Sequence, residues 1–306
     1  MNLNLEIDEY IKRMHHRQIN SVLVCQGQEI LAKRYYNGYH EDSNNVIKSV
    51  AKSIMSIATG IALDFGLIKS LDEPISNFIP QFNENREGYH KLITIRHLLT
   101  MTSGIHWNGG VHYHCPMLTQ MQRANDWISH IADCAMSNMP GTKYHYKEWD
   151  VILLAKLLDI ACQDLYDFLD ENLYQPLHIK SGRWYRSKCG VYYSVAFGNE
   201  KEEEVTSNLT ALDMLKIGQL FLNGGTFDGK QIISADYMIQ AIASSECNAG
   251  YGLLWWRGDH WYGCRGYGGQ SITVVPHKNA IVVTQATPTS RGMGYDDVIW
   301  HCMDLI

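Results

Sequence analysis

The sequence lacks several features that would place it in a special class of protein. No apolar run approaches the roughly 18 residues that a membrane-spanning helix needs, so we expect no membrane association. Basic residues are in the minority, with 26 lysines and arginines against 32 aspartates and glutamates and a net charge of −6. A nucleic-acid-binding protein normally carries a basic face, so nucleic acid is not an expected partner.

Neither paired cysteines nor a secretion signal is expected from the sequence. None of the eight cysteines forms a Cys-x-x-Cys pair, and their scatter is typical of a reducing compartment. Residues 1–8 have neither a basic start nor a long apolar core, so they do not resemble a signal peptide. These observations predict a cytoplasmic location.

What remains is the composition of an ordinary globular protein, with 306 residues of which 45% are hydrophobic and 19% charged. Apolar residues at helical spacing predict a helix over residues 3–14. Residues 21–25 and 30–36 flank a Gln-Gly-Gln turn and predict a β-hairpin. Residues 46–65 are apolar or small around the whole circumference, which indicates a helix buried inside the protein.

The remaining chain predicts helices first and then strands. We expect helices over 95–101, 149–162 and 209–223, strands over 252–257, 270–275 and 280–286, and a closing helix through Val298 to Ile306. Strands at both ends with helices between them indicate an α/β fold of the α+β type, built on an antiparallel sheet. We expect a single domain, 1–306, with an α/β part from 1–66 and 205–306 and a mainly helical insertion, 67–204.

One short motif carries possible chemistry. Ser49-Val50-Ala51-Lys52 puts a hydroxyl and an amine one helical turn apart, on the same face. A serine needs a base to become a nucleophile, and a desolvated lysine can serve. The positive end of the helix opposes protonation of Lys52 and can hold an oxyanion. Alone, such a tetrad also occurs by chance as a helix-start serine beside an unrelated lysine.

Further segments give the tetrad its context. Together they resemble the serine β-lactamase and penicillin-binding protein superfamily, and in particular its class C-related branch of esterases, D-aminopeptidases and 6-aminohexanoate-dimer hydrolases. The matching segments, in the order expected for that branch, are 46–53, 93–104, 140–146, 209–229 and 264–270. The resemblance runs from about residue 20 to the end of the chain and implies a β-lactamase-like fold.

The resemblance also implies roles for individual residues. Ser49 matches the acylated serine and Lys52 its partner amine, while Tyr146 matches the tyrosine that shuttles a proton between serine, leaving group and water. Gly266 matches the glycine of the Lys-Thr-Gly strand. The backbone N–H of Tyr267 would then join that of Ser49 as the oxyanion hole.

Two nearby aromatic residues and two nearby serines are weaker candidates. Tyr144 and Trp149 flank Tyr146 and are interpreted as packing residues. Ser53 and Ser103 lie in matching segments, but neither has a lysine one turn downstream on its own helix.

The sequence departs from the family pattern at two motifs. Lys-Thr-Gly is replaced by Cys264-Arg265-Gly266, which lacks the lysine and hydroxyl that bind a penicillin carboxylate. Weak or no β-lactamase activity is therefore expected, with Arg265 as a possible substitute cation among the substrate-binding candidates Glu148, Arg265 and Gly266. An arginine on a strand points outward as often as inward.

Tyr-x-Asn is replaced by Tyr146-Lys147-Glu148, and a carboxylate can play three roles here. Glu148 can pair with Lys52 and keep it charged, which would leave Tyr146 as the base. It can instead point into the cleft and bind an amine on the substrate, the role we favour. It can also form a surface pair with Lys147 and take no part in catalysis.

The other motifs carry less chemistry. A loop contains His106, His112, His114 and Cys115, whose types suit zinc but whose spacing matches no recognised site, so we predict no metal ligands. An aromatic run, Trp255, Trp256, Trp261 and Tyr262, fits core packing or a cleft wall. Residues 202–204 are three glutamates and indicate a solvated turn.

These observations predict a serine hydrolase that cleaves an ester or amide of a small molecule or short peptide. No metal or organic cofactor is implied. The alternative is a catalytically silent protein of the same fold that binds a small-molecule or protein partner. Glu148 supports the alternative, whereas the intact set of Ser49, Lys52 and Tyr146 favours the enzyme. Neither the substrate nor the oligomeric state follows from the sequence.

Overall fold

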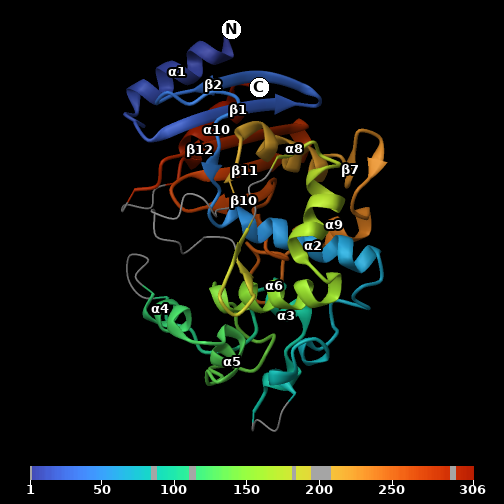
Figure 1. The fold of residues 1–306 in the computed structure, drawn as a ribbon. Coiled ribbons are helices and arrows are strands. Elements are labelled where there is room, and N and C mark those ends of the chain that lie inside the picture. The colour runs from blue at the N-terminus through green and yellow to red at the C-terminus, as the bar shows by residue number, and fades with distance from the viewer. Residues whose placement is uncertain (1, 84–87, 110–114, 181–183, 194–207, 290–293) are drawn as a thin grey trace.

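The computed structural model describes residues 2–83, 88–109, 115–180, 184–193, 208–289 and 294–306. Its centre is an antiparallel sheet of six strands in the order β2-β1-β12-β11-β10-β9 (Figure 1). The strands are β1 (Ile19–Gln26), β2 (Glu29–Tyr35), β9 (Trp256–Arg257), β10 (Tyr262–Gly266), β11 (Gln270–Val275) and β12 (Ala280–Ala286). Strands from both ends of the chain therefore lie side by side, as predicted.

Helices cover both faces of this sheet. On one face lie α1 (Leu3–Arg13) and α10 (Asp296–Asp304), and on the other α2 (Val50–Asp64) and α8 (Ala211–Leu222). Successive side chains of a strand point to opposite faces. Accordingly, Val22 and Val24 belong to the core beneath α1 and α10, while Leu23 and Cys25 belong to the larger core on the other face.

The helical elements lie mainly on the far side of α2 from the sheet (Figure 1). They are α3 (Ile95–Leu99), α4 (Pro116–Arg123), α5 (Trp127–Ala132), α6 (Glu148–Cys162) and α7 (Leu165–Leu169), with a π-helical turn at Asp170–Tyr174. Helix α9 (Ala235–Ile242) packs against α2. Three small antiparallel pairs of described strands lie outside the main sheet: β3 (Asn45–Val46) with β6 (Asn208–Leu209), β4 (Tyr185–Arg186) with β5 (Tyr192–Tyr193), and β7 (Thr226–Phe227) with β8 (Lys230–Gln231). Among the described residues, no helix has both the length and the apolar character needed to cross a bilayer.

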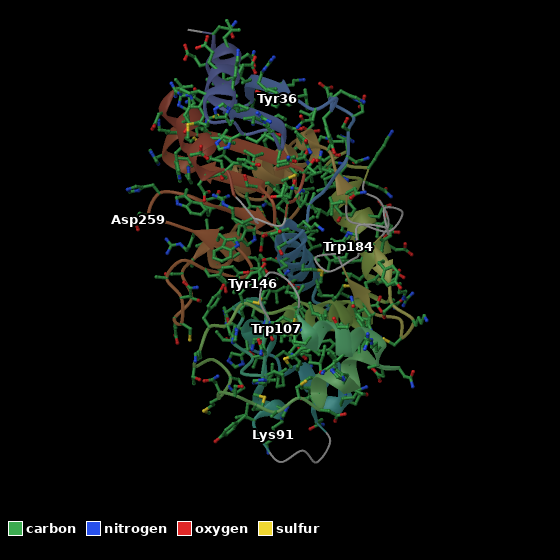
Figure 2. All side chains as sticks on the ribbon, turned by 90° about the vertical axis from the view of Figure 1, so that its left-hand side faces the viewer. Tyr36, Lys91, Trp107, Tyr146, Trp184 and Asp259 are labelled. Atoms are coloured by element: carbon green, nitrogen blue, oxygen red, sulfur yellow. The ribbon has the colours of Figure 1, made fainter. Side chains whose placement is uncertain are left out.

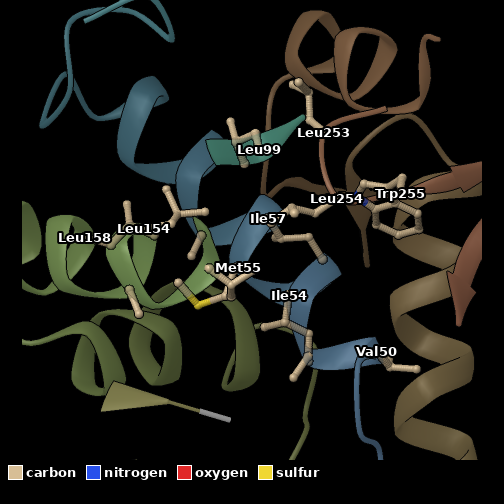
Figure 3. Packing of buried hydrophobic residues seen from close by; sticks show 14 of the residues in the cluster. Val50, Ile54, Met55, Ile57, Leu99, Leu154, Leu158, Leu253, Leu254 and Trp255 are labelled. Carbon is tan, nitrogen blue, oxygen red and sulfur yellow. The ribbon is translucent and has the colours of Figure 1, made fainter. Parts of the chain in front are cut away.

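Helix α2 is the centre of the packing. Every residue from Val50 to Ala62 is buried, as the apolar circumference of the sequence predicts. Figure 3 shows side chains of α2 packed among those of the elements around it, including Leu154 from α6 and Leu254 from the loop before β9. Each buried aliphatic side chain contributes roughly 1.5–3 kcal/mol. The start of α2 is therefore held rigidly in place.

The hairpin, the buried helix and the closing helix are confirmed, whereas the strand predicted over 252–257 is shorter than expected. Only Trp256–Arg257 pairs as a strand. Leu254 has a positive φ of 63°, and its N–H donates to the carbonyl of Leu99 in α3. This contact turns the chain away from the sheet. It joins residues that are far apart in the sequence, so the local pattern does not predict it.

Candidate active site

Ser49 stands where α2 begins. It is the N-cap residue, with φ −67° and ψ −2°, and its hydroxyl makes no capping hydrogen bond to the backbone. The preceding Lys48 has a positive φ of 51°, which is uncommon for a residue other than glycine. The hydroxyl of Ser49 is thus left available at the positive end of a buried helix, and the residue is partly exposed.

Lys52 lies one turn further along α2 and contacts both Ser49 and Glu148. Its Nζ donates to Ser49 Oγ over 3.0 Å and to Glu148 Oε1 over 2.8 Å. The side chain of Lys52 is 3% exposed and that of Glu148 13%. An ammonium buried this deeply requires a charged or strongly polar partner, and Glu148 supplies the charge.

Glu148 reaches Lys52 because of the way α6 begins. Lys147, its N-cap, is fully extended with φ −151° and ψ 155°. Glu148 is the first residue of α6, where the helix dipole favours a carboxylate. Three roles were left open for Glu148. The contact found in the structure is the one expected for the first role, the pair with Lys52. Lys147 is 2% exposed, so the surface pair is excluded.

Tyr146 places its ring over the ammonium of Lys52, with 5.3 Å between Nζ and the ring centroid. The ring stacks on Trp256 with centroids 5.8 Å apart and meets Tyr251 edge-on at 6.2 Å. In Figure 2, Tyr146 lies between Tyr36 at the sheet end and Lys91 at the helical end of the molecule. The aromatic neighbours hold Tyr146 where the sheet and the helical part meet.

Neighbouring charges and burial set the protonation states of Lys52 and Tyr146. Burial lowers the pKa of Lys52, but the carboxylate of Glu148, with help from Tyr146, outweighs burial and raises the pKa above its usual range. Burial raises the pKa of Tyr146, and Glu148 raises it further, against the opposing effects of Lys52 and Ser49. At neutral pH the resting site therefore holds an ammonium and a neutral phenol.

Gly266 ends β10 beside the start of α2. A side chain there would collide with the chain before Ser49, because a Cβ on Gly266 would lie 2.4 Å from the carbonyl oxygen of Ile47. Only glycine permits this close approach. Tyr267 follows in the turn to β11, and its hydroxyl donates to the carbonyl of Thr289. The structure therefore brings the segment that carries Tyr267 next to Ser49.

A pocket of about 280 Å³ opens at this junction. Its lining includes Ser49, Tyr146, Trp256, Arg265, Gly266, Tyr267, Tyr295 and Asp296. Trp256 is thus a cleft-wall residue, whereas Trp255 is fully buried. Sequence reasoning missed Tyr295 and Asp296, the N-cap and the first residue of α10, because no local pattern shows where that helix packs.

Arg265 and Cys264 point to opposite faces of β10. Cys264 is buried in the core that contains α2. The guanidinium of Arg265 donates to Thr273 Oγ1 over 2.8 Å, lies 4.6 Å from the ring centroid of Trp261, and is 3.4 Å from Asp296. These contacts fix Arg265 on the α10 side of the sheet.

The other serines considered are buried and engaged. Ser53 Oγ donates to the carbonyl of Leu254 over 2.7 Å. Ser103 is fully buried and its Oγ donates to Asp150. Of the three serines, Ser49 alone lines the pocket among the residues described.

The histidine loop forms no metal centre in the part of the chain that is described. His106 Nδ1 lies 2.9 Å from Ser137 Oγ, and Cys115 Sγ donates to the carbonyl of Asn108. His112 and His114 lie outside the described residues, as do residues 202–204. Within the described ranges, no three His, Cys, Asp or Glu side chains are grouped to bind a metal.

Comparison with known proteins finds a family whose model spans nearly the whole chain. Residues 7–297 match the family Beta-lactamase. Among curated relatives, Protein flp of Staphylococcus aureus is 24% identical over 183 residues, which are 56% of this chain and 36% of that protein. The chain thus matches only about a third of that relative's length.

Solved structures resemble the whole chain at low identity. A penicillin binding protein from Bacillus halodurans is 18% identical, with a TM-score of 0.74 covering 98% of this chain and 100% of the other. A D-stereospecific amidohydrolase from Streptomyces sp. is 14% identical, with a TM-score of 0.71 covering 97% of both chains. At these identities the likeness establishes the fold.

Proposed function

The chain belongs to the beta-lactamase family, and from that premise we propose that it is a serine hydrolase working through an acyl-enzyme on Ser49. The substrate is a carboxylic ester or amide in a small molecule or short peptide. The observation that carries the proposal is the contact of 3.0 Å between Lys52 Nζ and Ser49 Oγ at the edge of an open pocket. Tyr146 lines the same pocket and completes the group.

Acylation begins when Ser49 Oγ attacks the carbonyl carbon of the substrate. The hydroxyl proton passes to the unit formed by Lys52 and Tyr146, and the backbone N–H groups of Ser49 and Tyr267 stabilise the oxyanion. Collapse breaks the bond to the leaving alcohol or amine, which takes the proton from the same unit. Water then attacks the acyl carbon and gives a proton to the same unit, which returns it to Ser49 Oγ as the carboxylic acid leaves.

The reactive form must have lost one proton from the Lys52 and Tyr146 unit. Both pKa values are raised, because burial and Glu148 favour the neutral phenol and Glu148 favours the ammonium. The reactive fraction therefore grows as the pH rises above neutral. We expect a slow enzyme at pH 7 and a faster one under alkaline conditions.

Penicillins are poor candidates for the substrate. Cys264 occupies the position of the family's lysine and is buried in the core, so it offers the pocket no charge. Arg265 does line the pocket, but its guanidinium already donates to Thr273 Oγ1, lies over the ring of Trp261 and pairs with Asp296. A substrate without a carboxylate beside the scissile bond suits this pocket better.

A silent binding protein is the second candidate, and the contact of 2.8 Å between Lys52 and Glu148 favours it. A lysine that stays charged at all accessible pH values cannot accept a proton. Such a protein would keep the pocket and bind a ligand without forming a covalent bond.

Labelling with a fluorophosphonate at pH 7 and pH 9.5 tests the two candidates. The enzyme is expected to form one covalent adduct, located on Ser49 by peptide mass spectrometry, and to react faster at pH 9.5. Ser49→Ala should abolish the adduct. An adduct on Ser53 or Ser103, or no adduct at either pH, would contradict the mechanism.

A further inference from the structure

A second buried cluster lies directly behind the segment that carries Tyr146. Its members, which we call the buried anchor, are Ser103, Lys147 and Asp150, and they are 0%, 2% and 0% exposed. Lys147 Nζ donates to Ser103 Oγ over 3.2 Å and to the carbonyl of Ile105 over 3.0 Å. Ser103 Oγ in turn donates to Asp150 Oδ1. Since the cluster is closed to solvent, it is not a second active site.

The anchor and the Ser49 site share one short stretch of chain. Lys147 is extended, and alternate side chains of an extended segment point in opposite directions. Tyr146 and Glu148 accordingly meet Lys52, while Lys147 points the other way, into the loop that contains Ser103 and Ile105.

Burying a lysine this deeply is costly unless its charge and its donors are satisfied. A small or apolar residue at position 147 would fill the space without that cost. The ammonium makes directional hydrogen bonds that an apolar side chain cannot make. These bonds, to Ser103 and Ile105, fix the backbone of residue 147 relative to the loop. The backbone of residue 147 in turn sets where its two neighbours point.

We propose that Lys147 is a positioning residue, which with Ser103 and Asp150 fixes Tyr146 over Lys52. This inference rests on the proposed hydrolase function of Ser49. A displacement of about 1 Å at a catalytic group can lower the rate about a hundredfold. Loss of the anchor should therefore lower the turnover of the enzyme far more than its affinity for substrate.

Lys147→Met tests the proposal, with Lys156→Met as the matched control. Lys156 is on the same helix, 28% exposed and 3.9 Å from Asp159, so the same chemical change there should leave activity unchanged. For Lys147→Met we expect kcat per titrated Ser49 to fall about ten- to a hundredfold, with KM changed less than about threefold. Counting sites by phosphonate titration removes the effect of any unfolded protein.

Amide hydrogen exchange over residues 145–149 provides a readout that does not depend on activity. It should become faster in Lys147→Met and stay unchanged in Lys156→Met. If Lys147→Met does not fold, the double variant Lys147→Met/Asp150→Asn, which removes both buried charges, is measured in the same way.

The two proposals fail in different ways. If wild-type protein takes no adduct on Ser49, the hydrolase proposal fails, and faster exchange over 145–149 still supports the anchor. If Ser49 is labelled but the variant matches its control in kcat and in exchange, the anchor proposal is overturned.

Discussion

Two clusters in this protein have nearly the same chemical groups, and they differ in where those groups stand. In the Ser49 site and in the buried anchor alike, a lysine ammonium contacts a serine hydroxyl, at 3.0 Å and 3.2 Å. Each also holds a carboxylate. Ser49 is partly exposed and lines a pocket, whereas Ser103 is fully buried and hydrogen-bonded to Asp150.

The difference shows that residue types alone do not make a nucleophile. Ser49 stands at the start of a buried helix, where N–H groups and the helix dipole stabilise negative charge. The hydroxyl of Ser103 already donates to a carboxylate, and the residue is fully buried. Access and a source of oxyanion stabilisation separate the cluster that we propose to be reactive from the structural one.

Removing the proton carriers of the Ser49 site should have the largest effect. We expect Lys52→Ala and Tyr146→Phe each to lower kcat about a thousandfold, because general acid–base groups typically contribute that much. Because the proposed mechanism uses the two groups as one unit, the double variant should be scarcely slower than either single variant. Steady-state kinetics on a p-nitrophenyl ester measures all three, and fully additive losses would show that the groups act independently.

Asp150 allows the burial of the anchor to be measured. Burial raises the pKa of its carboxyl to about 6, against the opposing effects of Lys147 and Ser103. The folded pKa lies above the unfolded one, so this group's contribution to stability is complete below pH 4 and is lost as the pH rises through 6. A shift of about 2 pH units corresponds to about 3 kcal/mol.

Asp150→Asn has no carboxyl to titrate, so it isolates this contribution. The free energy of unfolding of the wild type, minus that of Asp150→Asn, should fall by about 3 kcal/mol between pH 4 and pH 7.5. Urea unfolding at several pH values measures the difference, and the other carboxylates cancel because both proteins share them. A difference that does not change with pH would show that Asp150 ionises as freely in the folded protein as in the unfolded one.

How much of this followed from the sequence depends on how far apart the interacting residues are. The hairpin and α2 depend on local patterns, and the contact between Ser49 and Lys52 depends on one helical turn. The sequence alone therefore predicts all three. Tyr146 was identified through resemblance alone, because 94 positions separate it from Lys52.

The remaining features depend on tertiary contacts. In the buried anchor, Lys147 and Asp150 are 44 and 47 positions away from Ser103. From the sequence alone, Lys147 would be taken for a surface residue. Arg265 faces α10 because of the register of β10, which a strand pattern alone does not determine. The contact of Glu148 with Lys52 likewise depends on where α6 packs against α2.

Glu148 offers the smallest change and the sharpest test of how the two clusters differ. Glu148→Gln keeps a polar side chain beside Lys52 but removes the charge that raises the pKa of its ammonium. More of the Lys52 and Tyr146 unit should then be in the reactive form at pH 7.

A pKa lowered by about one unit would raise the rate about tenfold, equally for neutral and amine-bearing esters. It would also shift the alkaline rise of the rate to lower pH. Initial rates on a matched pair of esters from pH 6 to pH 10 measure this. If Glu148→Gln instead slows only the amine-bearing ester and leaves the neutral one unchanged, the carboxylate recognises the substrate amine and does not restrain Lys52.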